Sequence, residues 1–442
     1  MTISPDVIAE LVQKHYDALP AKRKPTIRGN GLREWVPLAG IVAQDKNDEL
    51  WCLSIATGMK CLPSSKVAQA QGNLLHDWHA EVLVIRAFNR FVLDECKILA
   101  QGGSSKFLRR RTIGEIKNSQ IGKIEKDISW HGQSFTWKED IFLHMYCSEA
   151  PCGDASMELI MASQEDATPW DLPPEFLPNN TTASPTLPGR AYFSHLGITR
   201  RKPARPDAPP TLSKSCSDKL ALHQLTSLLS STTALLVSPN HVYIHTLILP
   251  LSRYSAVACH RAFSVSPGGR MSCLAHLTSN TKGGYAFHPF AVATTTSEFA
   301  FSQKQAKEEA GAAGIAPSNL ALAWTLSGLE EATLGGVLQG RKQSAADARG
   351  ASFASRRKLW GLAVEIVGLL STSPLPPLLQ DIRPEEGEGE IEVEIGKALG
   401  AKTYGEMKGS SLLEARRRVK EEARVEALKG WVRNLGDEYF HL

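Results

Sequence analysis

The chain has 442 residues, of which 42% are hydrophobic and 22% charged, and its formal net charge is +4. This composition is ordinary for a globular protein, and the charge falls short of the basic bias of a dedicated nucleic-acid-binding domain. The eight scattered cysteines exclude a small disulfide-rich secreted domain, and residues 1–20 lack the apolar run of a signal peptide. Prolines and histidines interrupt the most apolar stretch, 235–251, which excludes a membrane-spanning helix. We therefore expect a cytoplasmic and/or nuclear protein that is not secreted.

The hydrophobic pattern alternates between helical and strand periods along the chain. Apolar spacing predicts helices over 7–19, 80–93, 217–229, 355–370 and 411–431. Shorter apolar runs predict strands over 35–43, 49–55, 141–146, 234–237, 242–249 and 319–325. Strands interleaved with helices indicate an α/β layered fold.

Three polar stretches separate these elements, at 101–132, 163–189 and 371–390. Their composition buries too little apolar surface to order a chain, so we expect insertions that are loops or disordered. We see no internal repeat of domain size. We therefore expect one domain over 1–442, with a core at about 20–300 and a C-terminal supporting region at about 319–442.

A histidine, a carboxylate and a cysteine lie at predicted junctions between elements. His79 and Glu81 open a predicted buried helix. Cys152 follows a predicted strand, and we expect Pro151 beside it to start a helix whose positive end favours the Cys152 thiolate. Imidazole and thiolate are zinc ligands, and a catalytic zinc keeps three protein ligands and one water, whose pKa it lowers to roughly 7. A nearby carboxylate such as Glu81 can move the protons of that water. The order of these residues resembles the H-x-E and P-C-x-x-C signature of zinc-dependent nucleobase deaminases.

The second half of that signature is incomplete, because no cysteine lies three residues after Cys152. We expect the third ligand to be Cys216, which opens a predicted helix whose dipole favours a thiolate. Cys147 is the alternative, since it lies closer to Cys152 in sequence. It is at the end of a predicted strand, however, where no helix start lowers the pKa of its thiol. Each motif alone also fits a core histidine, a helix-start carboxylate or a common turn, whereas all three together indicate a zinc site.

Three motifs resemble those of the RNA adenosine deaminases, a family of tRNA-specific enzymes and double-stranded-RNA editing enzymes. They are Trp78-His79-Ala80-Glu81, the run Ser148 to Ala155, and Ser215-Cys216-Ser217-Asp218-Lys219. Gly29 to Val42 and Ala56 to Cys61 are similar to the tRNA-specific branch. The resemblance implies a cytidine-deaminase-like mixed sheet flanked by helices, with a mainly helical C-terminal extension.

The resemblance also implies a hydrolytic reaction, which converts adenosine to inosine in RNA and releases ammonia with one zinc per chain. For the tRNA branch the substrate is adenosine 37, next to the anticodon of alanine tRNA. We expect this substrate because the chain leaves no room for separate double-stranded-RNA-binding modules. The alternatives are a deaminase of double-stranded or messenger RNA, or a non-catalytic RNA-binding partner subunit. The presence of Glu81 argues against the last of these, and no obligate protein partner is implied.

The editing enzymes bury inositol hexakisphosphate beneath the active site, in a cage of cations and hydroxyl groups. The resemblance implies that this ligand would contact Arg86, Lys219, Arg341, Tyr404, Lys408, Arg418 and Trp431 here. Four positions in or near that pocket depart from the family pattern, namely Ile85, Leu222, Glu414 and Asn434, which leaves the ligand open. We interpret Arg416 and Arg417 as part of a solvated helix face.

A proline-rich loop before Cys216 carries further basic residues. We expect Arg200, Arg201, Lys202 and Arg205 to contact RNA phosphates beside the active site. The alternative is a solvated basic loop. An adenosine in an anticodon loop is already single-stranded, so little base-flipping energy is required.

Overall fold

The computed structural model describes residues 3–121, 130–163, 187–188, 195–202, 208–278, 283–345, 347–372 and 390–442. Its centre is an eight-stranded sheet with the strand order β10-β9-β6-β2-β3-β12-β13-β14. The strands are β2 (Leu38–Asp45), β3 (Leu50–Thr57), β6 (Ile141–Cys147), β9 (Ile244–Pro250), β10 (Ala291–Thr295), β12 (Leu320–Thr325), β13 (Glu330–Leu334) and β14 (Val337–Leu338). β6, β9 and β10 run parallel to one another and the other neighbours are antiparallel, so the sheet is mixed.

Strand β2 lies in the middle of the sheet and is buried along residues 38–43. A continuous apolar run of this kind is typical of a strand that is covered on both faces. Helix α1 (Pro5–Asp17) covers one face. It approaches the strand closely, because a Cβ on Gly40 would lie 2.5 Å from the Val12 side chain.

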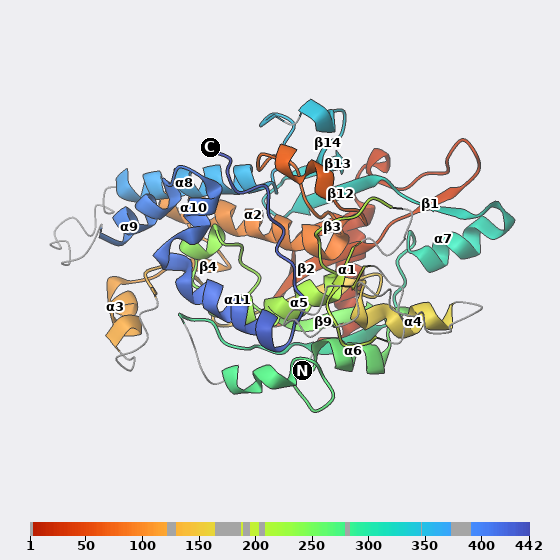
Figure 1. Cartoon of the computed structure of the whole chain (residues 1–442), viewed down its shortest axis with the longest axis horizontal. Helices are drawn as coiled ribbons and strands as arrows, with labels where there is room; N and C mark the ends of the chain where they lie inside the picture. The colour runs from red at the N-terminus through yellow and green to blue at the C-terminus, as the bar shows by residue number, and fades with distance from the viewer. Residues whose placement is uncertain are drawn as a thin grey trace, which may run out of the picture.

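The opposite face is covered by α2 (Ala80–Ala100) and α5 (Cys216–Thr226). The C-terminal helices, drawn in blue, gather around these two helices (Figure 1). They are α8 (Arg356–Thr372), α9 (Glu390–Leu399), α10 (Tyr404–Gly409) and α11 (Glu414–Glu426). Trp360 of α8 packs against Tyr404 and Phe440 inside the same hydrophobic cluster as α2. The C-terminal region therefore supports the helix that carries the predicted active-site residues.

The remaining elements lie around this framework. Two-stranded sheets pair β1 (Arg33–Trp35) with β11 (Ile315–Pro317), β4 (Leu108–Arg110) with β5 (Phe135–Trp137), and β7 (Leu187–Pro188) with β8 (Arg200–Arg201). The other helices are α3 (Ile113–Ile121), α4 (Met157–Ala162), α6 (Ala256–Phe263) and α7 (Gln303–Ala310). No helix among the described residues is long and apolar enough to cross a bilayer.

The predicted mixed sheet flanked by helices, with a helical C-terminal region, is confirmed. The strand predicted over 234–237 is wrong, because Thr233–Leu235 form a 3-10 turn closed by the side chain of Ser230. The described part of the stretch 101–132 is also more ordered than expected. It contains β4 and α3, and Phe107 stacks on the buried Trp137. Nearly all of 163–189 and 371–390 lies outside the described residues.

Candidate active site

Three elements bring the predicted metal ligands together. His79 immediately precedes α2, Cys152 follows β6, and Cys216 is the first residue of α5. One ligand atom from each lies within 4.8 Å of the others, and His79 Nδ1 is 3.8 Å from Cys152 Sγ. The alternative ligand, Cys147, is buried in β6 and belongs to neither group of potential metal ligands among the described residues. The geometry therefore favours Cys216 as the third ligand.

The second group shares His79 and adds Cys61 and Asp77. Cys61 lies near the start and Asp77 near the end of the loop that connects β3 to α2, and the sequence did not indicate either of them as a metal ligand. Asp77 already accepts hydrogen bonds from Lys202, Lys219 and Ser213. Since its oxygens are occupied in this way, the group of His79, Cys152 and Cys216 is the better candidate for a metal centre.

The two cysteine loops approach each other at Gly153. This residue has φ +102°, and a Cβ there would lie 2.3 Å from Ser215 Oγ. Glycine is required because an L side chain fits neither this backbone conformation nor this space. Ser217 joins the same loops, since its Oγ donates to the carbonyl oxygen of Pro151 at 2.9 Å and accepts from Ala155 N at 3.1 Å.

The expected helix start at Pro151 is absent. A 3-10 turn, Asp154–Ser156, precedes α4, so Cys152 does not lie at a helix N-terminus. Its thiolate is stabilised in another way. The hydrogen bond from the Cys216 thiol and the charge of Lys202 hold the pKa of Cys152 well below its ordinary value. The expected helix start at Cys216 is present, and Ser215 caps it by accepting from Asp218 N at 3.1 Å.

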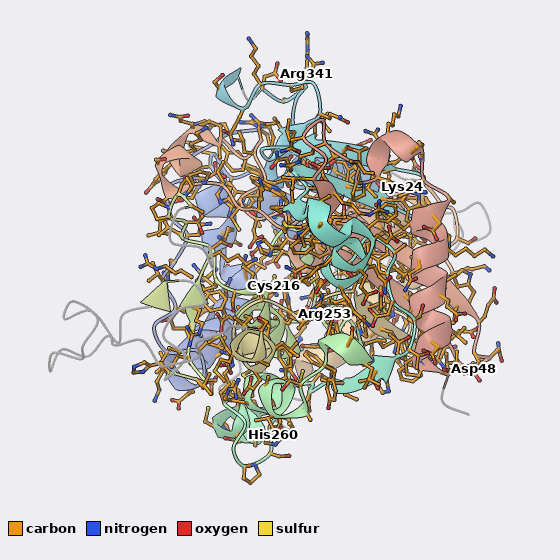
Figure 2. All side chains as sticks on the ribbon, turned by 90° about the vertical axis from the view of Figure 1, so that its right-hand side faces the viewer. Lys24, Asp48, Cys216, Arg253, His260 and Arg341 are labelled. Carbon is orange, nitrogen blue, oxygen red and sulfur yellow. The ribbon has the colours of Figure 1, made fainter. Side chains whose placement is uncertain are left out.

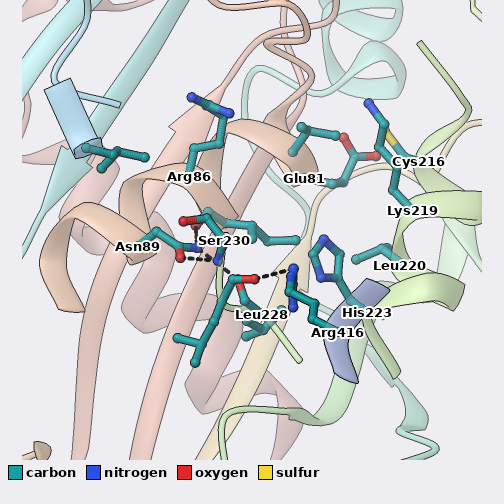
Figure 3. Close-up of a pocket in the computed structure, with 14 residues that line it drawn as sticks. Glu81, Arg86, Asn89, Cys216, Lys219, Leu220, His223, Leu228, Ser230 and Arg416 are labelled. Carbon is teal, nitrogen blue, oxygen red and sulfur yellow. Dashed lines mark hydrogen bonds between the residues drawn. The ribbon is translucent and has the colours of Figure 1, made fainter. Parts of the chain in front are cut away.

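Glu81 lies in the first turn of α2 and is only 5% exposed. Burial raises the pKa of its carboxyl group above the ordinary value. The side chain faces a cavity of about 170 Å³, which Cys216 also lines (Figure 3). A buried carboxyl group with a raised pKa is suited to accepting a proton and returning it.

A buried network connects the ligand residues. Lys202 Nζ donates to Asp77 Oδ2 at 2.8 Å and to Cys216 Sγ at 3.2 Å. Asp77 Oδ1 accepts from His79 N at 3.0 Å, and Lys219 also donates to Asp77. A charge-assisted contact of this kind stabilises a thiolate in a low-dielectric interior. The Lys202 ammonium therefore contacts buried groups of the site rather than solvent.

This placement corrects part of the predicted RNA clamp. Arg200 is 1% exposed and Lys202 is 5% exposed, so neither side chain is available to an RNA phosphate in this structure. Arg200 donates instead to the carbonyl oxygen of His195. Arg201 is half-buried, and Arg205 lies outside the described residues. The basic run at 200–202 predicted a loop that contacts RNA phosphates, with a solvated loop as the alternative. Its backbone instead pairs with residues 213–215 and turns the side chains of Arg200 and Lys202 inward.

Behind the candidate metal centre lies a cluster of cations and aromatic rings. Five of the seven residues predicted to contact an inositol phosphate belong to it or line its edge: Arg86, Lys219, Tyr404, Lys408 and Trp431. Arg356 and Lys408 lie 5.8 and 5.7 Å from the centre of the Tyr404 ring. Lys214 and Arg424 lie 5.4 and 5.5 Å from that of Trp431.

The other two predicted contacts lie elsewhere. Arg341 is exposed on the loop after β14 and lies far from Cys216 in the side-chain view (Figure 2). Arg418 is 62% exposed and pairs with Glu414 one turn earlier on α11. Both assignments are therefore corrected. Glu414, one of the four departures from the family pattern, is occupied by this exterior ion pair.

The structure adds cations that the sequence analysis missed. They are Lys214, Arg356, Arg416, Lys420 and Arg424. The interpretation of Arg416 as solvated is wrong, because it is 8% exposed and donates to the carbonyl oxygens of Thr226 and Leu229. A signal was present in the sequence, since positions 416, 420 and 424 recur at the i, i+4 spacing of one helix face.

A family model described as the adenosine-deaminase (editase) domain matches residues 54–435. The chain is 38% identical over 300 residues to the tRNA-specific adenosine deaminase 1 of Schizosaccharomyces pombe. The matched region covers 67% of this chain and 70% of that protein. It is 34% identical over 228 residues to the protein of the same name from Saccharomyces cerevisiae, covering 50% and 53%. It is 27% identical over 153 residues to the double-stranded RNA-specific adenosine deaminase of Mus musculus, covering 34% and 11%. With its deaminase-type sheet and a family match over most of its length, the chain belongs to the adenosine-deaminase (editase) family and is a hydrolytic adenosine deaminase.

Proposed function

We propose that this chain deaminates adenosine in tRNA, at position 37 next to the anticodon of alanine tRNA, with zinc held by His79, Cys152 and Cys216. One observation carries the proposal: three side chains suited to zinc converge beside a buried carboxyl group. The names of the S. pombe and S. cerevisiae relatives support tRNA as the substrate. The resemblance of the chain to the tRNA-specific branch supports position 37.

The donor set fits zinc. One imidazole nitrogen and two sulfurs are typical of zinc sites that keep one position open for water, as in alcohol dehydrogenase. The ligand atoms lie within 4.8 Å of one another, so a single ion can contact all three. Zinc would supply an acidified water as the nucleophile.

Glu81 would carry the protons of the reaction. Its carboxylate takes a proton as the water oxygen bonds to C6 of adenine, and it delivers that proton to the ring nitrogen. The carboxylate then takes the proton of the new hydroxyl group on C6 and gives it to the amine. The carbon–nitrogen bond breaks as the C6–oxygen double bond forms, and ammonia leaves. The burial that raises the pKa of Glu81 helps this group to hold a proton between the two steps.

Lys202 and Asp77 would fix the charge of the site. The Lys202 ammonium contacts the Cys216 sulfur at 3.2 Å and so stabilises a thiolate there. Asp77 holds that ammonium and also the backbone of His79. The pair therefore supports two of the three proposed ligands without touching the substrate.

We also propose that the cation cluster holds inositol hexakisphosphate. Many positive charges face one another there, and the carboxylates nearby are already paired, as Asp437 is with Arg356 and His76. The Nε atom of Arg424 is buried and has no hydrogen-bond partner among the described residues. A polyanion would neutralise these charges and satisfy the free donors, which stabilises the C-terminal helices against α5.

The lowered pKa of Lys420 gives this proposal a pH test. Burial and the charges of Arg424, Arg416, Lys408 and Lys214 hold its pKa well below 10.5. Between the folded pKa and 10.5 the unfolded chain binds more protons, so the unfolding free energy of ligand-free protein is expected to rise with pH. Added inositol hexakisphosphate favours the charged lysine and should flatten this rise.

The measurement is urea unfolding between about pH 7 and pH 9, with and without the ligand. The control is Lys420→Met, which should show a weaker pH dependence without the ligand. If the unfolding free energy of ligand-free Lys420→Met rises with pH as steeply as that of the parent, the pH dependence does not come from Lys420. Phosphate analysis of the purified protein gives a second readout, with six phosphates per chain expected.

The substrate is tested by mapping inosine in a panel of RNAs. We expect inosine at position 37 of alanine tRNA, and no product from a long RNA duplex at the same enzyme concentration. An adenosine in the anticodon loop requires little unstacking, whereas a duplex adenosine costs a few kcal/mol to extrude. Faster reaction on the duplex would favour the alternative function, and no inosine in any RNA would favour a non-catalytic binding subunit.

A further inference from the structure

Each proposed cysteine ligand is followed two residues later by a fully buried aspartate. Asp154 follows Cys152 and Asp218 follows Cys216, and both carboxylates are 0% exposed. Neither residue has a part in the proton transfers described above. A buried carboxylate is costly unless it is paired and hydrogen-bonded, so the partners of these two residues show what they hold in place.

Both partners are arginines from one short segment that begins on α6. Arg261 Nε donates to Asp154 Oδ2 at 3.0 Å, and its Nη2 donates to the backbone oxygen of the same residue at 3.0 Å. Arg270 Nη1 donates to Asp218 Oδ1 at 2.6 Å. The segment is closed on itself, because Arg270 N donates to the Arg261 oxygen at 2.9 Å and Arg270 Nε donates to the Ala262 oxygen at 3.0 Å.

Through these hydrogen bonds to the arginines, Asp154 and Asp218 hold the loops that carry Cys152 and Cys216. Asp218 Oδ2 accepts from Ser215 Oγ at 2.6 Å and from Arg200 N at 3.0 Å, which fixes the start of α5 on both sides of Cys216. Asp154 Oδ1 accepts from Gly197 N at 2.9 Å. The two cysteine loops are therefore held by Arg261 and Arg270, which are nine residues apart in sequence. The backbones of these two arginines are hydrogen-bonded to each other.

We propose that Arg261 and Arg270 are positioning residues for the metal centre, which set the separation of the Cys152 and Cys216 sulfurs. This inference rests on the proposed zinc site and adds residues that position its ligands without contacting the metal. Groups that orient ligands from behind tune metal affinity without contacting the metal. The arginines therefore act through Asp154 and Asp218, and their loss should loosen zinc rather than slow proton transfer directly.

The experiment compares Arg270→Gln and Arg261→Gln with the parent protein in competition with a chromophoric zinc chelator. Both variants are expected to bind zinc about 10–100-fold more weakly, as is usual for the loss of a group behind a ligand. Arg270→Lys should recover part of the affinity, since it keeps the charge. The control is Arg23→Gln, which breaks a partly buried ion pair with Glu330 on β13. It is expected to lower thermal stability and leave zinc affinity unchanged.

A cobalt-substituted protein gives a spectroscopic readout, because the sulfur-to-cobalt absorption bands report how both thiolates bind. These bands should shift in Arg270→Gln and stay unchanged in Arg23→Gln. Zinc affinities and spectra of Arg261→Gln and Arg270→Gln equal to those of the parent would overturn the proposal. If Arg270→Gln does not fold, Asp218→Asn breaks the same pair with a side chain of equal shape, and parental zinc affinity there would overturn it too. A parent protein that binds no zinc would instead remove the metal site itself.

Discussion

The Glu81→Ala protein is expected to form inosine at least about 10²–10⁴-fold more slowly than the parent, which is the usual contribution of a positioned general acid–base. Glu81 is 5% exposed, and among the described residues no other carboxylate lines its cavity. Its loss therefore removes the carboxylate that is proposed to take the proton of the attacking water. Zinc content should stay near one per chain, because the three proposed ligands are intact.

The matched control is Glu331→Gln, which alters a buried carboxylate outside the site. Glu331 accepts from Ser352 Oγ and Phe353 N, so this change should reduce stability while inosine formation continues. The measurement is mass spectrometry of the reacted tRNA, with metal analysis of each protein. Normal deamination by Glu81→Ala would refute the mechanism, and loss of zinc from that variant would move the residue into the metal-binding set.

The second large effect concerns the third ligand. Cys216→Ser is expected to lose zinc, and with it both activity and the folding free energy that metal binding contributes. Cys147→Ser is expected to keep zinc, because Cys147 lies inside β6 and belongs to neither group of potential metal ligands among the described residues. Metal analysis and thermal unfolding of the two proteins, with and without chelator, give the comparison.

The two serine variants replace the same atom in two buried cysteines, so each serves as the control of the other. A small loss of stability in Cys147→Ser without loss of metal fits the assignment. Loss of zinc from Cys147→Ser together with full zinc in Cys216→Ser would reassign the site to the residue that is closer in sequence.

The grouping of the three proposed ligands could be predicted because these residues lie where elements begin or end. His79, Cys152 and Cys216 combine ligand chemistry with positions before a helix, after a strand and at a helix start. The order of motifs along the chain then restricts the possible sites. The helix start expected at Pro151 was wrong, because the loop after Gly153 is held by contacts to Ser215 that local sequence does not reveal.

The cation cluster was only partly predictable, because the inward face of a charged helix depends on what packs against it. In α11, Arg416 and Arg418 are neighbours in a basic run, yet one is 8% exposed and the other has a side chain that is 62% exposed. The packing of α11 on α5 decides between them. Lys202 shows the same difficulty, since a basic loop residue is usually solvated unless a buried carboxylate such as Asp77 lies opposite.

Crystals of the protein as purified, measured at the zinc absorption edge, test the central claim most directly. We expect one anomalous peak per chain, within about 2.0–2.3 Å of the His79 imidazole and the sulfurs of Cys152 and Cys216. A peak bound to Cys61 and Asp77, a peak bound to Cys147, or no peak at these side chains would contradict it.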